Sequence, residues 1–395
     1  MADLSIEFLG KRMVNPFLIA ATPSSDNYDI IKKGFEVGWG GAVFKTTSVE
    51  GQEVPLKYPM MTGINYDGKQ TMALANIDLI SEHHIDEVEE VVKRLKKEFP
   101  DRMLIPSIMG EKKEHWQELV ERLIKAGADM IECSFSCPQG TLGDEPGKML
   151  GQSAKATETV AKWVKDAAGD TPVIIKLTPQ VTDIVAIANA VKRSGCDAVC
   201  TINSVKGLIG VDLDTFSPLP SVDGKGTYAG ITGPAIKPIA LMCLSEVAQN
   251  VDIGISAVGG CSTWSDAIEF FLLGAGTVQI GTAIMHYGFR ILWEILSGVN
   301  NYLDEKGFNS IEEIKGKALP FLTTHDGLVQ EADPNSEINW DLCIKCDLCY
   351  IACSDGAHGA ITLNEDRLPV VDEDKCPGCG LCASICPVEG CIEIK

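Results

Sequence analysis

Eight cysteines near the C-terminal end constrain the structure of this chain more than any other feature. They form two runs of identical spacing, Cys343-x2-Cys346-x2-Cys349-x3-Cys353 and Cys376-x2-Cys379-x2-Cys382-x3-Cys386. Three closely spaced thiolates followed by a fourth are what ligation of an iron–sulfur cube requires. Two zinc sites are an alternative, but zinc ribbons usually place two CxxC pairs about 15–20 residues apart and need no triplet. The runs therefore predict two 4Fe–4S clusters.

The spacing resembles that of bacterial two-cluster ferredoxins, in which the fourth cysteine of each run ligates the cluster of the other run. The resemblance implies one cluster on Cys343, Cys346, Cys349 and Cys386. It implies a second cluster on Cys376, Cys379, Cys382 and Cys353. We expect a small ferredoxin-like domain over residues 336–395 that handles electrons one at a time.

The composition of the chain argues against certain binding partners and against secretion. The net charge of −21 argues against nucleic acid or an anionic membrane surface, because both repel an acidic protein. No segment approaches the roughly 18 apolar residues of a membrane span. The N-terminus shows neither the basic nor the apolar region of a secretion signal, which also disfavours a disulfide framework for the 15 cysteines. We expect a cytoplasmic protein.

Short apolar runs alternate with amphipathic stretches from about residue 15 to residue 300. The eight predicted strands span residues 16–21, 41–45, 103–109, 130–135, 172–177, 198–202, 253–258 and 277–281. Helical patterns lie between them at 112–126, 154–168, 182–194, 234–250 and 263–273. This alternation fits a (β/α)8 TIM barrel better than an open doubly wound sheet, which would need a GxGxxG fingerprint that the sequence lacks.

The predicted domain organisation is therefore an α/β protein of two domains. Residues 1–300 would form the barrel, residues 301–335 a linker with a helical pattern at 310–317, and residues 336–395 the ferredoxin-like domain. Insertions at 46–100 and 203–232 follow predicted strands, as does a Gly- and Pro-rich loop at 138–152. All three would lie at the end of the barrel where active sites are built.

A barrel attached to clusters suggests a flavin, which exchanges both single electrons and hydride. Gly259-Gly260 and Gly281-Thr282 close the seventh and eighth predicted strands, where barrels often bind phosphate, although turn chemistry is an alternative. Lys45 and Lys176 end two other strands. A buried ammonium must reach a polar partner, and that partner is either a flavin or a structural ion pair.

Six segments carry a resemblance to a known family. They are residues 40–47, 75–81, 136–138, 176–179, 201–204 and 232–238. They resemble the FMN domain of dihydropyrimidine dehydrogenases, which is related to class 1 dihydroorotate dehydrogenases. Together with the twin cysteine runs, the chain is similar to the separate FMN and iron–sulfur subunit of the bacterial NAD-dependent enzymes.

The resemblance implies roles for particular residues. Contacts to FMN would come from Lys45, Lys176, Asn203, Thr232 and Gly233, and its phosphate would lie against Gly259, Gly260, Gly281 and Thr282. The pocket over the flavin would be lined by Asn76, Asn203 and Ser204. Carboxamides suit a pyrimidine, because each offers two donors and an acceptor to the N–H and C=O groups of the ring.

Two positions depart from the family pattern. Ser134 stands where the animal enzyme has an asparagine, and it becomes a candidate substrate contact. Leu150 stands before Gly151-Gln152 where that enzyme carries its proton-donating cysteine, and a leucine cannot donate a proton. Asp144, Lys148 and Ser153 are the candidate donors in this loop.

The expected function is reversible reduction of the 5,6 double bond of uracil or thymine at FMN. Electrons would come through the clusters from a partner subunit that binds FAD and NAD(P)H, in a hetero-oligomer. Three alternatives stay open. They are a dihydroorotate dehydrogenase, a reductase of another small cyclic enone or amide, and an electron-transfer module in which FMN is only a relay.

Overall fold

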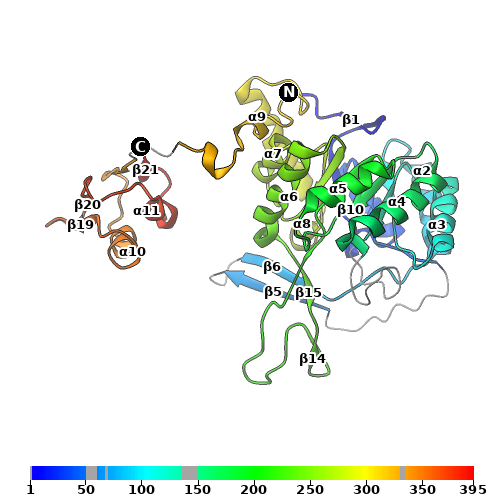
Figure 1. The fold of residues 1–395 in the computed structure, drawn as a ribbon, viewed down its shortest axis with the longest axis horizontal. Helices are drawn as coiled ribbons and strands as arrows, with labels where there is room; N and C mark the ends of the chain where they lie inside the picture. The colour runs from blue at the N-terminus through cyan, green and yellow to red at the C-terminus, as the bar shows by residue number, and fades with distance from the viewer. Residues whose placement is uncertain (1, 50–59, 67–69, 136–149, 330–333) are drawn as a thin grey trace. The chain divides into compact units, whose positions relative to one another are not determined.

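A computed structural model describes residues 2–49, 60–66, 70–135, 150–329 and 334–395 (Figure 1). The chain divides into two compact units, Met1–Phe321 and Leu322–Lys395. Each unit has its own apolar core.

The first unit is built on a parallel sheet whose strands coincide with the eight predicted runs. In chain order they are β3 (Phe17–Ile19), β4 (Gly41–Val43), β7 (Met103–Ile105), β8 (Ser107–Ile108), β9 (Ile131–Ser134), β10 (Val173–Lys176), β11 (Ala198–Thr201), β16 (Gly254–Val258) and β17 (Thr277–Ile280). The order across the sheet is β7-β4-β3-β17-β16-β11-β10-β9-β8. Most of these strands are buried along their whole length, which explains why each reads as a continuous apolar run.

The sheet closes through one strand that is broken at Pro106. β7 and β8 stand at opposite ends of the sheet order, yet only this proline separates them in the chain. Proline has no N–H to donate, but the Pro106 carbonyl accepts a hydrogen bond from the Glu132 N–H at 3.0 Å. On the other side, the Phe44 N–H donates to the Ile105 carbonyl at 3.0 Å. The predicted TIM barrel is therefore confirmed.

Helices surround the barrel (Figure 1). The five expected helical patterns correspond to α3 (Lys113–Ala126), α4 (Ala154–Ala168), α5 (Ile184–Arg193), α6 (Lys237–Asn250) and α7 (Trp264–Leu272). The first turn of the 234–250 pattern is a separate 3-10 helix, η3 (Pro234–Ile236). Four helices were not anticipated: α1 (Tyr28–Val37), α2 (Ile85–Glu98), α8 (Thr282–Tyr287) and α9 (Ile291–Lys306). Each expected helix except α6 has a pronounced apolar face that packs on the sheet, as in α4, where Val160, Ala161 and Val164 are buried.

The two long insertions pair with each other to form a second, four-stranded sheet. Its strands are β5 (Met61–Tyr66), β6 (Gln70–Asn76), β12 (Val205–Gly207) and β15 (Ala229–Thr232), in the order β12-β15-β6-β5. β6 and β15 are antiparallel, with Asn76 opposite Gly230 and Leu74 opposite Thr232. Residues far apart in the sequence thus become neighbours above the barrel.

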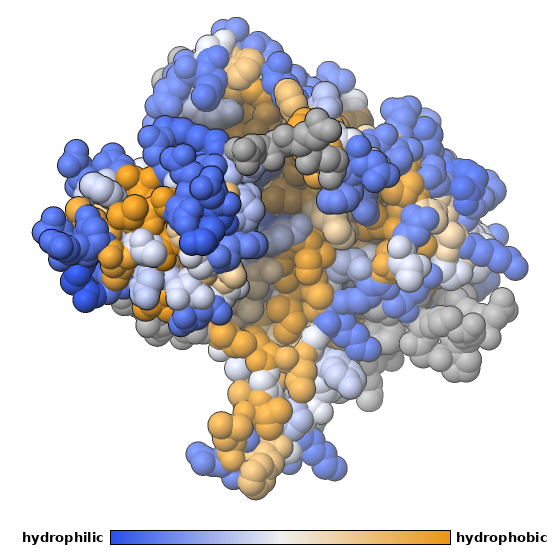
Figure 2. Space-filling model, turned by 60° about the vertical axis from the view of Figure 1, so that its left-hand side comes forward, coloured by the Kyte–Doolittle hydropathy of each residue, from blue (hydrophilic) through white to orange (hydrophobic). Residues whose placement is uncertain are grey.

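Between β12 and β15 the chain projects as an arm that carries the short strands β13 (Ser221–Val222) and β14 (Lys225–Gly226). Figure 2 shows apolar surface along this projection. The exposed apolar side chains of the segment include Leu213 and Phe216. The arm begins and ends at residues that line the site described below.

The region between the two units differs from the expected linker. Residues 301–321 belong to the first unit, because α9 continues to Lys306 and the segment after it packs on α7. The Gly316 N–H donates to the Phe271 carbonyl at 2.9 Å, and Ile311 and Ile314 are buried. The helix predicted over 310–317 is wrong: this segment forms a series of turns. Its apolar periodicity reflects contact with the barrel unit.

The second unit contains two antiparallel strand pairs and two short helices. β18 (Ser336–Ile338) pairs with β21 (Ile392–Ile394), and β19 (Ile361–Leu363) pairs with β20 (Pro369–Val371). Part of each cysteine run lies on a helix, α10 (Leu348–Gly356) or α11 (Leu381–Ile385). No helix in the described part of either unit is long and apolar enough to cross a membrane.

Candidate active site

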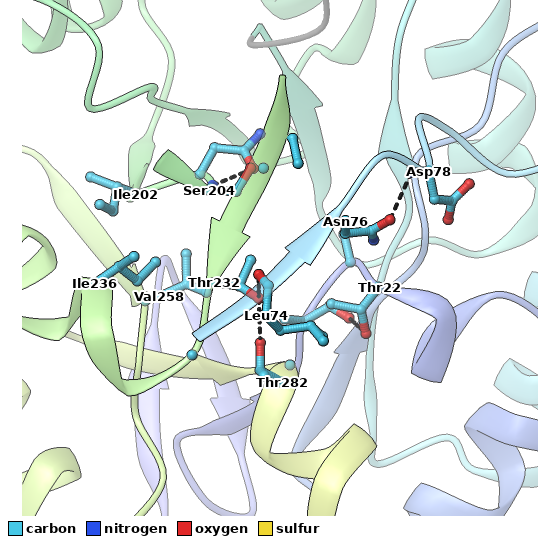
Figure 3. A pocket seen from close by; sticks show the side chains of 18 of the residues that line it. Thr22, Leu74, Asn76, Asp78, Ile202, Ser204, Thr232, Ile236, Val258 and Thr282 are labelled. Carbon is cyan, nitrogen blue, oxygen red and sulfur yellow. Dashed lines mark hydrogen bonds between the residues drawn. The ribbon is translucent and has the colours of Figure 1, made fainter. Parts of the chain in front are cut away.

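A pocket of about 640 Å³ opens at the carboxyl ends of the barrel strands, beneath the second sheet (Figure 3). It gathers most of the residues that the sequence singled out for binding. Those lining it are Lys45, Asn76, Lys176, Asn203, Ser204, Thr232, Gly233, Gly259, Gly260, Gly281 and Thr282. They come from several strand ends and from both insertions, so only the closed barrel brings them together.

Lys45 follows β4 and forms a buried ion pair with Asp78. The side chains of Lys45 and Asp78 are only 10% and 2% exposed. The Asp78 N–H also donates to the Asn76 Oδ1 atom at 2.7 Å, as Figure 3 shows. Sequence reasoning missed Asp78, although its position two residues after Asn76 in a quoted segment was an available signal. The pair means that Lys45 already has a structural partner at the edge of the pocket.

Two glycine-containing loops form one wall of the pocket. Gly260 has a φ of +82°, and a Cβ atom there would lie 2.8 Å from the Lys237 backbone nitrogen. A Cβ atom on Gly281 would lie 2.7 Å from Thr22 Cγ2. Nearby, the Thr282 hydroxyl donates to the Thr232 hydroxyl at 2.9 Å (Figure 3). The close packing of these loops against neighbouring chain segments therefore requires glycine at both positions.

Asp266 holds the loop that follows Gly260. Its Oδ1 atom lies 2.6 Å from Lys237 Nζ, and its Oδ2 atom accepts from the Ser262 and Thr263 N–H groups, both at 2.9 Å. Burial alone would raise the pKa of Asp266, but the hydrogen bonds from Lys237 and Ser262 outweigh it, and the pKa lies below its ordinary value. The carboxylate thus stabilises the folded state above the ordinary pKa of 3.8.

We expect Asp266→Asn to lower the free energy of unfolding by about 2 kcal/mol at pH 7, because charge-assisted hydrogen bonds are lost. The difference from the parent should begin to shrink as the pH falls below 3.8, where the carboxyl of the unfolded chain takes up its proton, and it should be lost as the pH falls through the lower pKa of the folded carboxyl. Urea unfolding at pH 7 and near pH 3.5 measures both values. The matched control is Asp252→Asn, at a fully exposed carboxylate that forms an ion pair with Lys192. A difference that did not depend on pH would contradict this role of the charge.

The predicted substrate contacts divide into two groups. Asn76 lies on β6, and Asn203 and Ser204 follow β11, and all three line the pocket. The Asn203 Oδ1 atom accepts from the Ser204 N–H at 2.7 Å, which fixes the orientation of the carboxamide. Ser134 ends β9 and is buried, and it is not among the described residues that line the pocket. Ser134 lies beside Lys176 in the parallel register of β9 and β10, and its contact with substrate stays a prediction.

Of the three candidate proton donors, the structure describes only Ser153. Asp144 and Lys148 lie outside the described residues. Ser153 is the N-cap of α4, where its hydroxyl accepts from the Ala156 N–H at 3.3 Å, and it does not line the pocket. Leu150 is buried rather than directed into the pocket, whereas Gln152 does line it. Among the described residues of this loop, the only pocket-lining side chain is thus an amide.

The second unit brings cysteines from both runs together. Cys343, Cys346 and Cys349 line one small cavity together with Cys386 of the other run, which is the crossed set that the spacing implies. Cys391, which belongs to neither run, lies beside the same cavity. Of the other set, Cys376 and Cys382 lie 3.6 and 3.2 Å from the Ser336 hydroxyl, and Cys353 accepts from the Ala360 N–H at 3.3 Å. In the part of the chain that the structure describes, no three His, Cys, Asp or Glu side chains converge as ligands of a single ion would.

Comparison with known proteins agrees with both units. Residues 3–303 match the model of the dihydroorotate dehydrogenase family, and residues 336–394 match that of the 4Fe-4S dicluster domain. The chain is 40% identical to the NAD-dependent dihydropyrimidine dehydrogenase subunit PreA of Escherichia coli strain K12, over 99% of this chain and 95% of that protein.

Other relatives cover a smaller share of this chain. The chloroplastic dihydropyrimidine dehydrogenase (NADP(+)) of Arabidopsis thaliana is 36% identical over 83% of this chain and 80% of that protein. The catalytic subunit of dihydroorotate dehydrogenase B (NAD(+)) of Pyrococcus abyssi is 34% identical over 80% of this chain and 99% of that protein.

Proposed function

Because the chain belongs to the dihydroorotate dehydrogenase family, and within it to the dihydropyrimidine dehydrogenase subunits, we propose that it reduces the 5,6 double bond of uracil or thymine reversibly. The observation that carries the proposal is the convergence of Lys45, Lys176, Asn76 and Asn203 in one pocket at the carboxyl end of the barrel. Two buried cations and two carboxamides suit an anionic cofactor and an amide-rich ring.

The residues present fit FMN as the cofactor. The glycine wall, with Gly259, Gly260, Gly281 and the Thr282 hydroxyl, offers the space and polarity that its phosphate needs. Lys176 and Lys45 would lie near the ring system. When bound, FMN supplies a group that exchanges hydride with the substrate and single electrons with iron–sulfur clusters.

The side chains of this chain would bind and orient the pyrimidine. Asn76 and Asn203 would recognise its N–H and C=O groups, and the two carboxamides are held by hydrogen bonds to the Asp78 and Ser204 backbone. Such preorganised groups lower the cost of bringing the reacting atoms together. The second sheet contributes Asn76 and Thr232 to the lining of the pocket, and a loop residue after Ser134 would supply the proton.

The two cysteine sets would carry electrons to and from the barrel as two 4Fe–4S clusters. The E. coli relative is named as a subunit of an NAD-dependent enzyme, and this sequence contains no GxGxxG fingerprint. We therefore place the nicotinamide and FAD sites on a separate partner subunit, in a hetero-oligomer. The acidic chain would suit a partner with a more basic docking surface.

The test uses the complete chain purified anaerobically with FMN and intact clusters. We expect it to oxidise dihydrouracil or dihydrothymine with an artificial electron acceptor and to show little NADH oxidation by itself. Dihydroorotate and reduced cyclic enones are the competing substrates in the same assay. Turnover of dihydroorotate without turnover of either dihydropyrimidine would reject the proposed substrate class. Robust NADH oxidation by the isolated chain would reject the separate partner.

A further inference from the structure

A network of buried polar side chains lies inside the barrel directly beneath the pocket. Its central member is Gln279 on β17, which is 1% exposed. The Gln279 Nε2 atom lies 2.8 Å from Glu132 Oε2, 3.1 Å from Ser256 Oγ and 3.3 Å from Cys200 Sγ. These partners come from β9, β16 and β11, so the network ties four barrel strands together.

Glu132 contributes a fully buried carboxyl group to this network. Its Oε1 atom lies 3.5 Å from Lys176 Nζ and forms no hydrogen bond with any described residue. Burial raises the pKa of the neighbouring Cys200 thiol well above its ordinary value, so this thiol stays neutral. Glu132 is the acidic member of the network and forms an ion pair with Lys176.

The position of Glu132 links the barrel interior to the pocket. Lys176 and Gln279 both line the pocket, whereas Glu132 lies beneath them and does not. A carboxylate buried at such a place is costly, and apolar side chains of similar size often stabilise a core equally well. The stability of the fold therefore does not explain an acid at this position. The effect of Glu132 on the charge of the pocket does explain it.

We propose that Glu132 is a positioning residue that holds the ammonium group of Lys176 and the carboxamide of Gln279 at the pocket floor and balances the charge of the lysine. The proposal rests on the proposed function, because it concerns the flavin that Lys176 would contact. Glu132 itself does not line the pocket, so it would act through Lys176 and Gln279. It sets how much net positive charge the floor of the pocket presents.

The direction in which Glu132 shifts the midpoint potential of the flavin follows from electrostatics. A flavin gains negative charge on reduction, and uncompensated positive charge nearby favours the reduced form. Replacing Glu132 by glutamine keeps the size of the side chain and removes the charge that balances Lys176. The reduced form should gain roughly tenfold over the oxidised form, less than a directly adjacent unit charge would give at an effective dielectric near 20, because Glu132 lies beneath Lys176 and not in the pocket. For a two-electron couple this is a rise in midpoint potential of about 30 mV.

The experiment compares the parent and Glu132→Gln, each as the full chain loaded with FMN. The flavin midpoint potential is measured by redox titration, and the affinity for sulfite, which adds to flavins in positively charged sites, is measured by absorbance. We expect a higher potential and about tenfold tighter sulfite binding in the variant. The matched control is Thr277→Val, because Thr277 donates to Ser256 at 2.8 Å in the same network but carries no charge. An unchanged or lowered potential in Glu132→Gln overturns the proposal.

Glu132→Asp covers the case in which the glutamine variant does not fold. It keeps the charge but moves it away by one methylene, so the rise in potential should be smaller. The ratio of reduced to oxidised flavin should increase about threefold. A parental potential in this variant would show that the negative charge alone is sufficient, and a potential below that of the parent would overturn the proposal. A parent chain that fails to bind FMN would instead reject the proposed function, and a parent that binds FMN without turning over pyrimidines would reject only the substrate.

Discussion

Replacing Lys45 by methionine is expected to lower the free energy of unfolding of the FMN-free chain by about 3–5 kcal/mol, the usual cost of breaking a buried ion pair. The substitution leaves the Asp78 carboxylate without its ammonium partner at a side chain that is only 2% exposed. Its Oδ1 atom already has no hydrogen-bond partner among the described residues, so no other group there compensates for the loss. Urea unfolding of the single variant measures the effect.

The double variant Lys45→Met/Asp78→Leu separates structure from function. It removes both charges, so most of the lost stability should return, while pyrimidine turnover should stay abolished because the cation at the pocket is gone. Lys206→Met is the control, since Lys206 is an exposed lysine that also lines the pocket, and we expect a change within about 0.5 kcal/mol. A Lys45→Met variant as stable as the parent would show that water or another group already compensates for the charge of Asp78.

Replacing Cys386 by serine should remove one of the two proposed clusters and reduce NAD-linked turnover by more than about 100-fold, since even residues that only orient metal ligands are worth about 10–100-fold. Cys386 lies in the same cavity as Cys343, Cys346 and Cys349, although it belongs to the other cysteine run. Iron content should fall by about half. Dihydropyrimidine oxidation with a dye that reacts directly at the flavin should be retained.

Pairs of variants test the crossed arrangement itself. Cys343→Ser and Cys386→Ser should remove the same cluster, so the double variant should contain as much iron as either single variant. If each run held its own cluster, the double variant would lose both clusters and nearly all its iron. Cys391→Ser is the matched control, because Cys391 lines the same cavity without belonging to the predicted ligands. Electron paramagnetic resonance of the reduced proteins identifies the cluster that remains.

The barrel could be predicted from the sequence because a buried parallel strand needs apolar side chains on both faces. The eight runs at 16–21 through 277–281 satisfy that condition and appear as strands. Helix α2 was missed because it lies in residues 46–100, which were interpreted as an insertion. Helix α1 was missed because no helical pattern was assigned between the first two predicted strands. The helix expected over 310–317 failed for the converse reason, since Ile311 and Ile314 face the barrel unit with helical spacing but without a helix.

The site was predictable where a single residue type at a strand end indicates its role, as with Lys45 and Gly260. It was not predictable where the role depends on a partner supplied by the closed barrel. Glu132 reads as one polar residue in an apolar run, and only the fold places it beside Lys176 and Gln279, which lie on other strands. Asp78 reads as one acid among many, and only its burial against Lys45 distinguishes it.

The strand interrupted at Pro106 has a consequence for the behaviour of the protein in a crowded solution. Because its two halves are both ends of the barrel sheet, each half is hydrogen-bonded to a different neighbour and the sheet exposes no unpaired edge. An exposed edge is a template on which strands of other molecules can add, and it is a common origin of aggregation. Closure through a single broken strand thus lets this chain keep long runs of Val, Ile and Leu in its strands without offering them to another copy.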